Sequence, residues 1–187
     1  GRTLIAGGVG CGGGRGGIGA GTVAGGDKGR SRGLCPGQRD ATLELSGNVN
    51  GIAAAHNVEL DQESAEPVVC LLAEQRKVGK KGGSMRLGTW PTKIVHGTLA
   101  EKIYKHDEVL ERHRHRYEFN MKYRDQMAEK GFLISGTSPD GSLAELIELR
   151  DHPFFLACQY HPEFQSKPNK PHPLFSGFIR ASLAHQD

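Results

Sequence analysis

Glycine is distributed very unevenly along the chain, and this limits what its first part can fold into. Residues 1–33 hold 15 of the 27 glycines in the 187-residue sequence. A segment that is almost half glycine loses much backbone entropy on folding and offers few side chains to bury. We therefore expect residues 1–32 to form a glycine-rich, flexible or disordered start, and residues 33–187 to form the folded domain.

Charge, hydropathy and cysteine spacing exclude several classes of protein. The chain has 24 Lys and Arg against 21 Asp and Glu, a balance that fits neither an acidic tail nor a histone-like polycation. No apolar run approaches the ~20 residues of a membrane span, so no membrane partner is expected. The four cysteines form no CxxC pair, which argues against a zinc ribbon, and free thiols are typical of a cytoplasmic protein.

Hydrophobic patterning after residue 33 predicts an α/β domain that mixes helices with strands. In residues 109–119, His113 and His115 alternate with arginines, which places the two types on opposite faces of an extended strand. Helices are predicted for residues 37–50, 121–130 and 174–183, and strands for residues 132–135, 143–149 and 154–160. Turns are predicted at residues 138–141 and 150–153.

Cys35 is the first candidate for chemistry, because it lies in the small-residue segment Gly33-Leu34-Cys35-Pro36-Gly37 just before a predicted helix. A nucleophile on a sharp strand-to-helix turn needs small neighbours, and a helix N-terminus lowers the pKa of a thiol. The alternative is a buried structural cysteine beside a turn.

The second candidate is the segment Gln159-Tyr160-His161-Pro162-Glu163. In an extended chain, residues two apart point the same way, so Glu163 can accept a hydrogen bond from one imidazole nitrogen of His161 while the other nitrogen faces a thiol. Cys35, His161 and Glu163 would then be nucleophile, base and orienting group. The alternative is a loop histidine beside an unrelated carboxylate.

The glycine-rich start allows a third, weaker interpretation. Leu4-Ile5 is expected to end a short strand before the glycine pair Gly7-Gly8, whose backbone N–H groups can hold an oxyanion. Matches to GxGxxG in the same segment arise by chance in so much glycine, so a dinucleotide site is rejected. Binding of nucleic acid by this segment is an alternative we do not favour, because it has no aromatic residue to stack on bases.

Five stretches make residues 33–187 resemble the class I glutamine amidotransferase domain of the CTP synthase family. They are GGSMRLG (82–88), ERHRHRYEFN (111–120), SGTSPDGSLAELIEL (135–149), DHPFFLACQYHPEF (151–164) and PHPLFSGFI (171–179). The resemblance implies a flavodoxin-like fold, a mostly parallel sheet flanked by helices, here incomplete at the N-terminus. It also implies a glutaminase that supplies ammonia for ATP-dependent amination of UTP to CTP in pyrimidine biosynthesis.

The resemblance implies a role for each site residue. Cys35, His161 and Glu163 fall at the catalytic positions, and no metal is expected. The positions expected to bind L-glutamine are Gly8, Pro36, Gly37, Gln38, Arg39, Glu59 and Arg116. No cofactor is expected in this fragment: ATP and Mg²⁺ belong to a separate synthetase (amidoligase) domain, and GTP acts as effector. The full-length enzyme is expected to be a homo-oligomer.

One departure from the family pattern bears directly on activity. Pro36 follows the nucleophile, where the family has leucine, and proline has no backbone N–H to offer an oxyanion. Losing one such donor typically costs ~10²–10³ in turnover. Two alternatives therefore stay open: a catalytically weakened amidotransferase-like domain, and a non-enzymatic module that binds RNA or a partner through the glycine-rich arm.

Overall fold

The computed structural model describes residues 2–5, 30–34, 42, 55–57, 66–71 and 85–184. The strands are β1 (Arg2–Ile5), β2 (Arg30–Leu34), β3 (Ala55–Asn57), β4 (Glu66–Leu71), β5 (Arg86–Ile94), β6 (Glu108–His115), β7 (Tyr117–Phe119), β8 (Phe132–Thr137), β9 (Ala144–Leu149) and β10 (Phe155–Cys158). The helices are α3 (Leu99–Tyr104), α4 (Arg124–Ala128) and α5 (Pro173–Leu183), with 3-10 turns η3 (Met121–Tyr123) and η4 (Pro162–Phe164).

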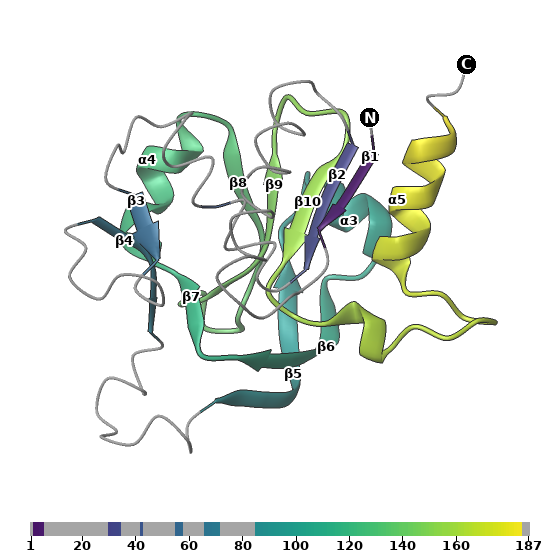
Figure 1. Cartoon of the computed structure of the whole chain (residues 1–187), viewed down its shortest axis with the longest axis horizontal. Helices are drawn as coiled ribbons and strands as arrows, with labels where there is room; N and C mark the ends of the chain where they lie inside the picture. The colour runs from purple at the N-terminus through teal and green to yellow at the C-terminus, as the bar shows by residue number, and fades with distance from the viewer. Residues whose placement is uncertain are drawn as a thin grey trace.

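Seven of these strands form one sheet in the order β1-β2-β10-β9-β8-β5-β6, and β3, β4 and β7 form a second, smaller sheet (Figure 1). In the large sheet β2 lies parallel to both β1 and β10. The other four neighbouring pairs are antiparallel. The α/β class is confirmed, but the expectation of a mostly parallel sheet is wrong for the part of the sheet that the structure describes.

Short connections explain two of the four antiparallel pairs, β8 with β9 and β9 with β10. The predicted turn at residues 138–141 joins β8 to β9, and its N–H of Gly141 donates to the carbonyl of Ser138 at 2.8 Å. The predicted turn at residues 150–153 joins β9 to β10. Parallel neighbours need a crossover of a dozen or more residues, so connections this short can only reverse the chain.

The centre of the large sheet is buried on both faces, because hydrophobic side chains pack against it from each side. Every described side chain from Phe154 to Tyr160 is buried. Leu146 and Leu156 pack with α3 and α5 on one face, whereas Ile147 and Phe155 pack with α4 and β7 on the other. Figure 1 shows α3 and α5 beside β10 and β2, and α4 beside β8.

Several local predictions are confirmed. The strand ending at Ile5 is β1, and the last helix is α5. The helix predicted for residues 121–130 divides into η3 and α4, and Gly131 follows with a positive φ of 87°. The helix predicted for residues 37–50 lies outside the described residues except at Thr42, which is helical.

Nothing in the described part of the chain is suited to crossing a lipid bilayer as a helix, since no helix there has the necessary length and apolar character.

Candidate active site

His161 and Glu163 form a hydrogen-bonded pair just beyond the end of β10. The Nδ1 atom of His161 lies 2.7 Å from Oε1 of Glu163. A carboxylate oxygen accepts, so Nδ1 carries the proton and Nε2 keeps a lone pair. The predicted contact is therefore present, but the chain is not extended there: Pro162 opens the 3-10 turn η4, which brings Glu163 back toward the imidazole.

Backbone and aromatic contacts hold this histidine in place. The N–H of His161 donates to the carbonyl of Arg112 on β6 at 2.8 Å, which fastens the loop to the sheet. The Phe164 ring stacks on the imidazole with centroids 5.2 Å apart and planes 28° from parallel. The guanidinium carbon of Arg112 lies 5.8 Å from the centroid of the Phe164 ring.

The predicted nucleophile lies outside the described residues, but the strand that leads to it is described. β2 ends at Leu34, and Leu34 pairs with Cys158 at the end of the parallel strand β10. The carboxyl ends of parallel strands lie at the same edge of a sheet. His161 follows three residues after Cys158, so the backbone register brings the chain just before Cys35 and the chain just before His161 to one edge of the sheet.

Most of the predicted glutamine-binding positions also lie outside the described residues. These are Gly8, Pro36, Gly37, Gln38, Arg39 and Glu59. Together with the catalytic roles of Cys35, His161 and Glu163, they stay predictions. So does the division of the chain at residue 32.

Arg116 is the one predicted glutamine-binding residue whose surroundings are described. It lies on a bend between β6 and β7 and is half-buried, whereas Arg112 and Arg114 on β6 are exposed. The bend corrects the prediction of one strand over residues 109–119, because β6 and β7 belong to different sheets. The Nε–H of Arg116 is buried and has no hydrogen-bond partner among the described residues, which leaves a donor for a ligand.

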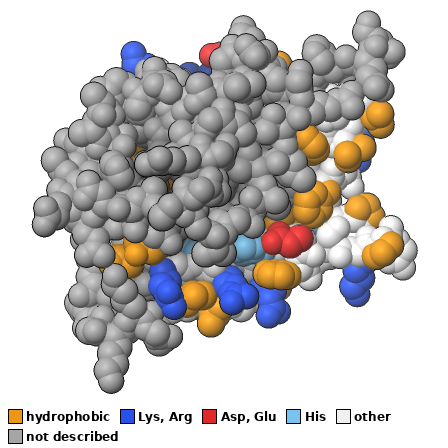
Figure 2. Space-filling view, viewed as in Figure 1, with side chains coloured by type: hydrophobic (Ala, Val, Ile, Leu, Met, Phe, Trp, Pro, Cys, Tyr) orange, Lys and Arg blue, Asp and Glu red, His pale blue; other side chains and the backbone are white. Residues whose placement is uncertain are grey.

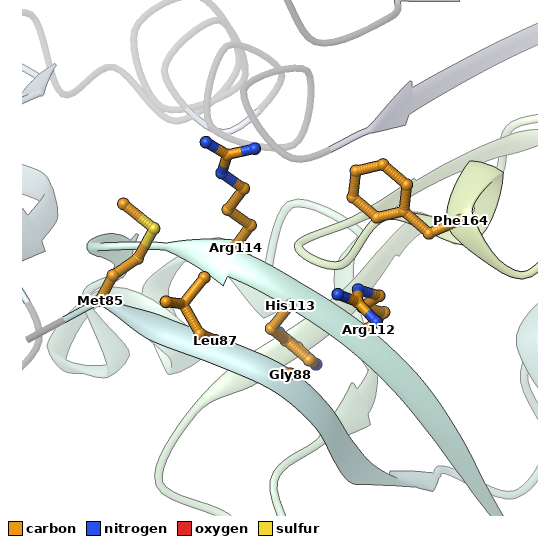
Figure 3. Close-up of a pocket in the computed structure, with 7 residues that line it drawn as sticks. All are labelled: Met85, Leu87, Gly88, Arg112, His113, Arg114 and Phe164. Atoms are coloured by element: carbon orange, nitrogen blue, oxygen red, sulfur yellow. The ribbon is translucent and has the colours of Figure 1, made fainter.

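A pocket of about 860 Å³ opens over β5 and β6 next to His161. Figure 3 shows side chains from both strands and from η4 around it. Its described lining residues are Met85, Leu87, Gly88, Arg112, His113, Arg114 and Phe164. Basic and hydrophobic side chains gather along this edge in Figure 2. The pocket therefore combines positive charge with exposed apolar surface.

Sequence reasoning missed a buried polar cluster beneath this pocket. His113 Nδ1 lies 3.0 Å from His115 Nε2 and 3.6 Å from Glu145 Oε2, and all three residues are buried. The guanidinium of Arg86 pairs with Oε1 of Glu145. The HxH pattern pointed to the two histidines, but neither Arg86 nor Glu145 carried a signal. Pairing of β5 with β6 places Arg86 opposite His115, whereas Glu145 lies on β9, which does not pair with β6.

The ligand atoms of His113, His115 and Glu145 lie within 4.8 Å of one another, close enough to raise the question of a metal. His115 Nδ1 faces the carbonyl of Tyr117 at 3.1 Å and so carries a proton, leaving Nε2 to accept from His113. Nδ1 of His113 carries the shared proton and therefore has no lone pair for an ion, while the lone pair of His115 Nε2 is directed at that proton. Because Arg86 also neutralises Glu145, this geometry favours a hydrogen-bonded cluster over a metal site.

Burial of His113 makes a testable contribution to the pH dependence of stability. Desolvation, aided by the Arg86 charge, lowers the pKa of His113 from 6.5 to about 2. Between those values the unfolded chain binds a proton that the folded chain does not, so stability is lost as the pH falls below 6.5. We expect this residue to contribute a slope of about 1.4 kcal/mol per pH unit in that window. Urea unfolding of the wild type and of His113→Asn from about pH 7 to about pH 5 measures it.

The His113→Asn variant should show a shallower slope than the wild type, whatever its stability near neutral pH. His106→Asn, which removes a histidine from an exposed position, is the control and should keep the wild-type slope. Equal slopes for all three proteins would show that His113 does not titrate differently on unfolding.

Comparison with known proteins fixes the family. Residues 27–181 match the glutamine amidotransferase class-I family. The chain belongs to this family. CTP synthases of Nostoc punctiforme and Staphylococcus aureus are 53% and 52% identical to it over 152 and 154 residues, which is 81% and 82% of the chain. The glutaminase domain of a Trypanosoma brucei CTPS, with bound acivicin, superposes with a TM-score of 0.91 at 35% identity, covering 98% of this chain and 71% of that one.

Within the amidotransferase family the chain is thus homologous to the glutaminase domain of CTP synthases. It spans only 28% and 29% of the length of the Nostoc and Staphylococcus proteins. The resemblance drawn from the ERHRHRYEFN and DHPFFLACQYHPEF stretches is confirmed.

Proposed function

We propose that this chain is the glutaminase part of a CTP synthase and hydrolyses L-glutamine to glutamate and ammonia. The observation that carries the proposal is the 2.7 Å hydrogen bond from His161 Nδ1 to Glu163, which leaves Nε2 as a base at the carboxyl edge of β10. The pairing of Leu34 with Cys158 supports it, because the chain reaches Cys35 at the same edge. Homology to CTP synthase glutaminase domains supports it independently.

In the proposed reaction, Sγ of Cys35 attacks the side-chain amide carbon of glutamine while His161 Nε2 takes the thiol proton. The C–N bond then breaks, His161 returns the proton to the leaving ammonia, and a glutamyl thioester remains. Water attacks the thioester carbon with His161 again as base, the C–S bond breaks, and the sulfur regains a proton. Glu163 keeps the imidazole in the required tautomer and stabilises its charged form.

The binding roles that accompany this reaction are also proposals. Arg116 would pair its unsatisfied Nε–H with the negatively charged end of the substrate. Glu59 would hold the α-amino group. Gly8 and the segment Pro36, Gly37, Gln38 and Arg39 would surround the amide group. In a full-length enzyme, ammonia would pass to a synthetase domain that uses ATP and Mg²⁺ to aminate UTP, with GTP as effector.

The proposed nucleophile is tested with diazo-oxo-norleucine, a glutamine analogue that alkylates an activated thiol with loss of N₂. We expect the folded chain to gain one adduct, located at Cys35 by peptide mass spectrometry. Excess L-glutamine should protect it, because both compounds occupy one site. The buried Cys70 and Cys158 are internal controls and should stay unmodified. A folded sample without any adduct on Cys35 would contradict an active glutaminase and favour the weakened domain.

A further inference from the structure

A chain of buried hydrogen bonds lies directly behind His161. The hydroxyls of Tyr160 and Tyr104 are 2.7 Å apart, and Tyr104 donates to Oε1 of Glu111 at 2.7 Å. Nε2 of His172 lies 2.8 Å from the same oxygen. Tyr160 follows β10, Tyr104 ends α3, Glu111 lies on β6, and His172 is the N-cap of α5. Four separate elements therefore meet in one polar network inside the hydrophobic core.

The direction of every hydrogen bond in this network is determined. Nδ1 of His172 accepts the N–H of Leu174 at 3.3 Å, so Nε2 carries the proton and donates to Glu111. Because the Tyr104 hydroxyl donates its only proton to Glu111, its oxygen accepts the hydrogen bond from Tyr160. Burial raises the pKa of both tyrosines well above the ordinary value, which keeps both hydroxyls protonated. Tyr104 and His172 thus donate to one carboxylate oxygen, and Tyr160 is connected to it through Tyr104.

This polar network makes the folded state less stable than apolar side chains in the same positions would. Glu111 is 1% exposed, and its second oxygen, Oε2, has no hydrogen-bond partner among the described residues. A buried acidic group with an unsatisfied oxygen is unfavourable compared with apolar side chains of similar volume. Directional buried hydrogen bonds instead select one arrangement of the groups that they join.

Two neighbouring residues of β6 hold two neighbouring residues of the loop after β10. Glu111 holds the Tyr160 hydroxyl through Tyr104, and the carbonyl of Arg112 accepts the backbone N–H of His161 at 2.8 Å. Tyr160 is fully buried, whereas 14% of the His161 side chain is exposed. The loop is thus attached at both residues that flank the Tyr160–His161 peptide bond. The Tyr160 side chain points into the core.

We infer that Tyr160 is a positioning residue whose hydroxyl, held by Tyr104 and Glu111, fixes the direction of the His161 imidazole. The role in turnover rests on the proposed function, in which the imidazole must meet the thiol of Cys35. The orientation itself does not rest on it. Loss of the hydroxyl removes the side-chain attachment directly before His161 and allows the imidazole to leave its hydrogen bond with Glu163.

The test compares Tyr160→Phe and Tyr104→Phe with Tyr123→Phe, a control that removes another buried phenol from the opposite face of the sheet. In ¹⁵N-histidine-labelled protein, the Nδ1–H resonance of His161, assigned with His161→Asn, should shift or broaden in the first two variants and stay unchanged in the third. A general loss of packing would not select this resonance. Unchanged His161 signals in folded Tyr160→Phe and Tyr104→Phe would overturn the inference.

Alkylation by diazo-oxo-norleucine supplies the functional readout. We expect Tyr160→Phe to lower the maximal rate of Cys35 alkylation by about tenfold, because a misdirected base is costly even over short distances. The concentration of half-saturation should stay the same, since Tyr160 is not part of the proposed binding site. If the wild type is not alkylated, the proposed function fails while the resonance of His161 still decides the positioning role. Normal alkylation of both variants would exclude that role in turnover.

Discussion

Replacing His161 with alanine will slow glutamine hydrolysis by about 10²–10⁴-fold, the usual contribution of a positioned general base. In the proposed mechanism the imidazole takes the Cys35 proton and returns it to ammonia, and alanine does neither. His161 is partly exposed and its ring is not part of either core cluster, so we expect the variant to fold. Release of ammonia, measured with a coupled dehydrogenase assay at saturating glutamine, gives the ratio of the two rates.

Glu163→Gln tests the second member of the pair and should have a smaller effect on the rate than His161→Ala. Its amide oxygen can still accept from Nδ1 of His161, but it lacks the charge that stabilises the imidazolium, so a smaller loss is expected than for His161→Ala. The exposed Glu129→Gln serves as a control for loss of one carboxylate. If His161→Ala hydrolysed glutamine at the wild-type rate, His161 would not be the base, whatever its distance from Glu163.

Local periodicity predicted β6, the strand that supplies Arg112, His113 and Arg114 to the pocket. The alternation in residues 109–115 correctly placed His113 and His115 on the face opposite Arg112 and Arg114, and the structure shows that the histidine face is the buried one. The turn at residues 138–141 was predicted from its local sequence, Ser-Pro-Asp-Gly. The pair of His161 and Glu163 was also predicted, although by an extended geometry that the 3-10 turn replaces.

Contacts between distant residues could not be predicted in this way. Nothing near Glu145 indicates that β9 delivers it to Arg86, 59 residues earlier, or that His172 reaches Glu111 from 61 residues away. The mixed sheet could not be predicted either, because the order and direction of strands depend on contacts between distant segments. Arg116 shows the limit of periodicity: the alternation continues through it, but the chain bends there to enter a second sheet.

Pro36 follows the proposed nucleophile directly and tests a different part of the mechanism. Pro36 lies outside the described residues, but the covalent structure of proline is enough to predict its effect. In amidotransferases that resemble this chain, the residue after the cysteine is expected to donate its backbone N–H to the oxyanion. Proline has no such proton. Its ring is compatible with the first turn of a helix, so the substitution would weaken catalysis without disturbing the fold.

Restoring the donor should therefore raise activity. We expect Pro36→Leu to accelerate ammonia release from glutamine by about 10²–10³-fold, the usual effect of one oxyanion-hole donor. The Michaelis constant should change little, because the added hydrogen bond strengthens as charge develops on the amide oxygen. Pro139→Leu, in the exposed turn before β9, is the matched control and should leave the rate unchanged. A Pro36→Leu protein no faster than the wild type would mean that other N–H groups hold the oxyanion, and that this proline does not weaken the enzyme.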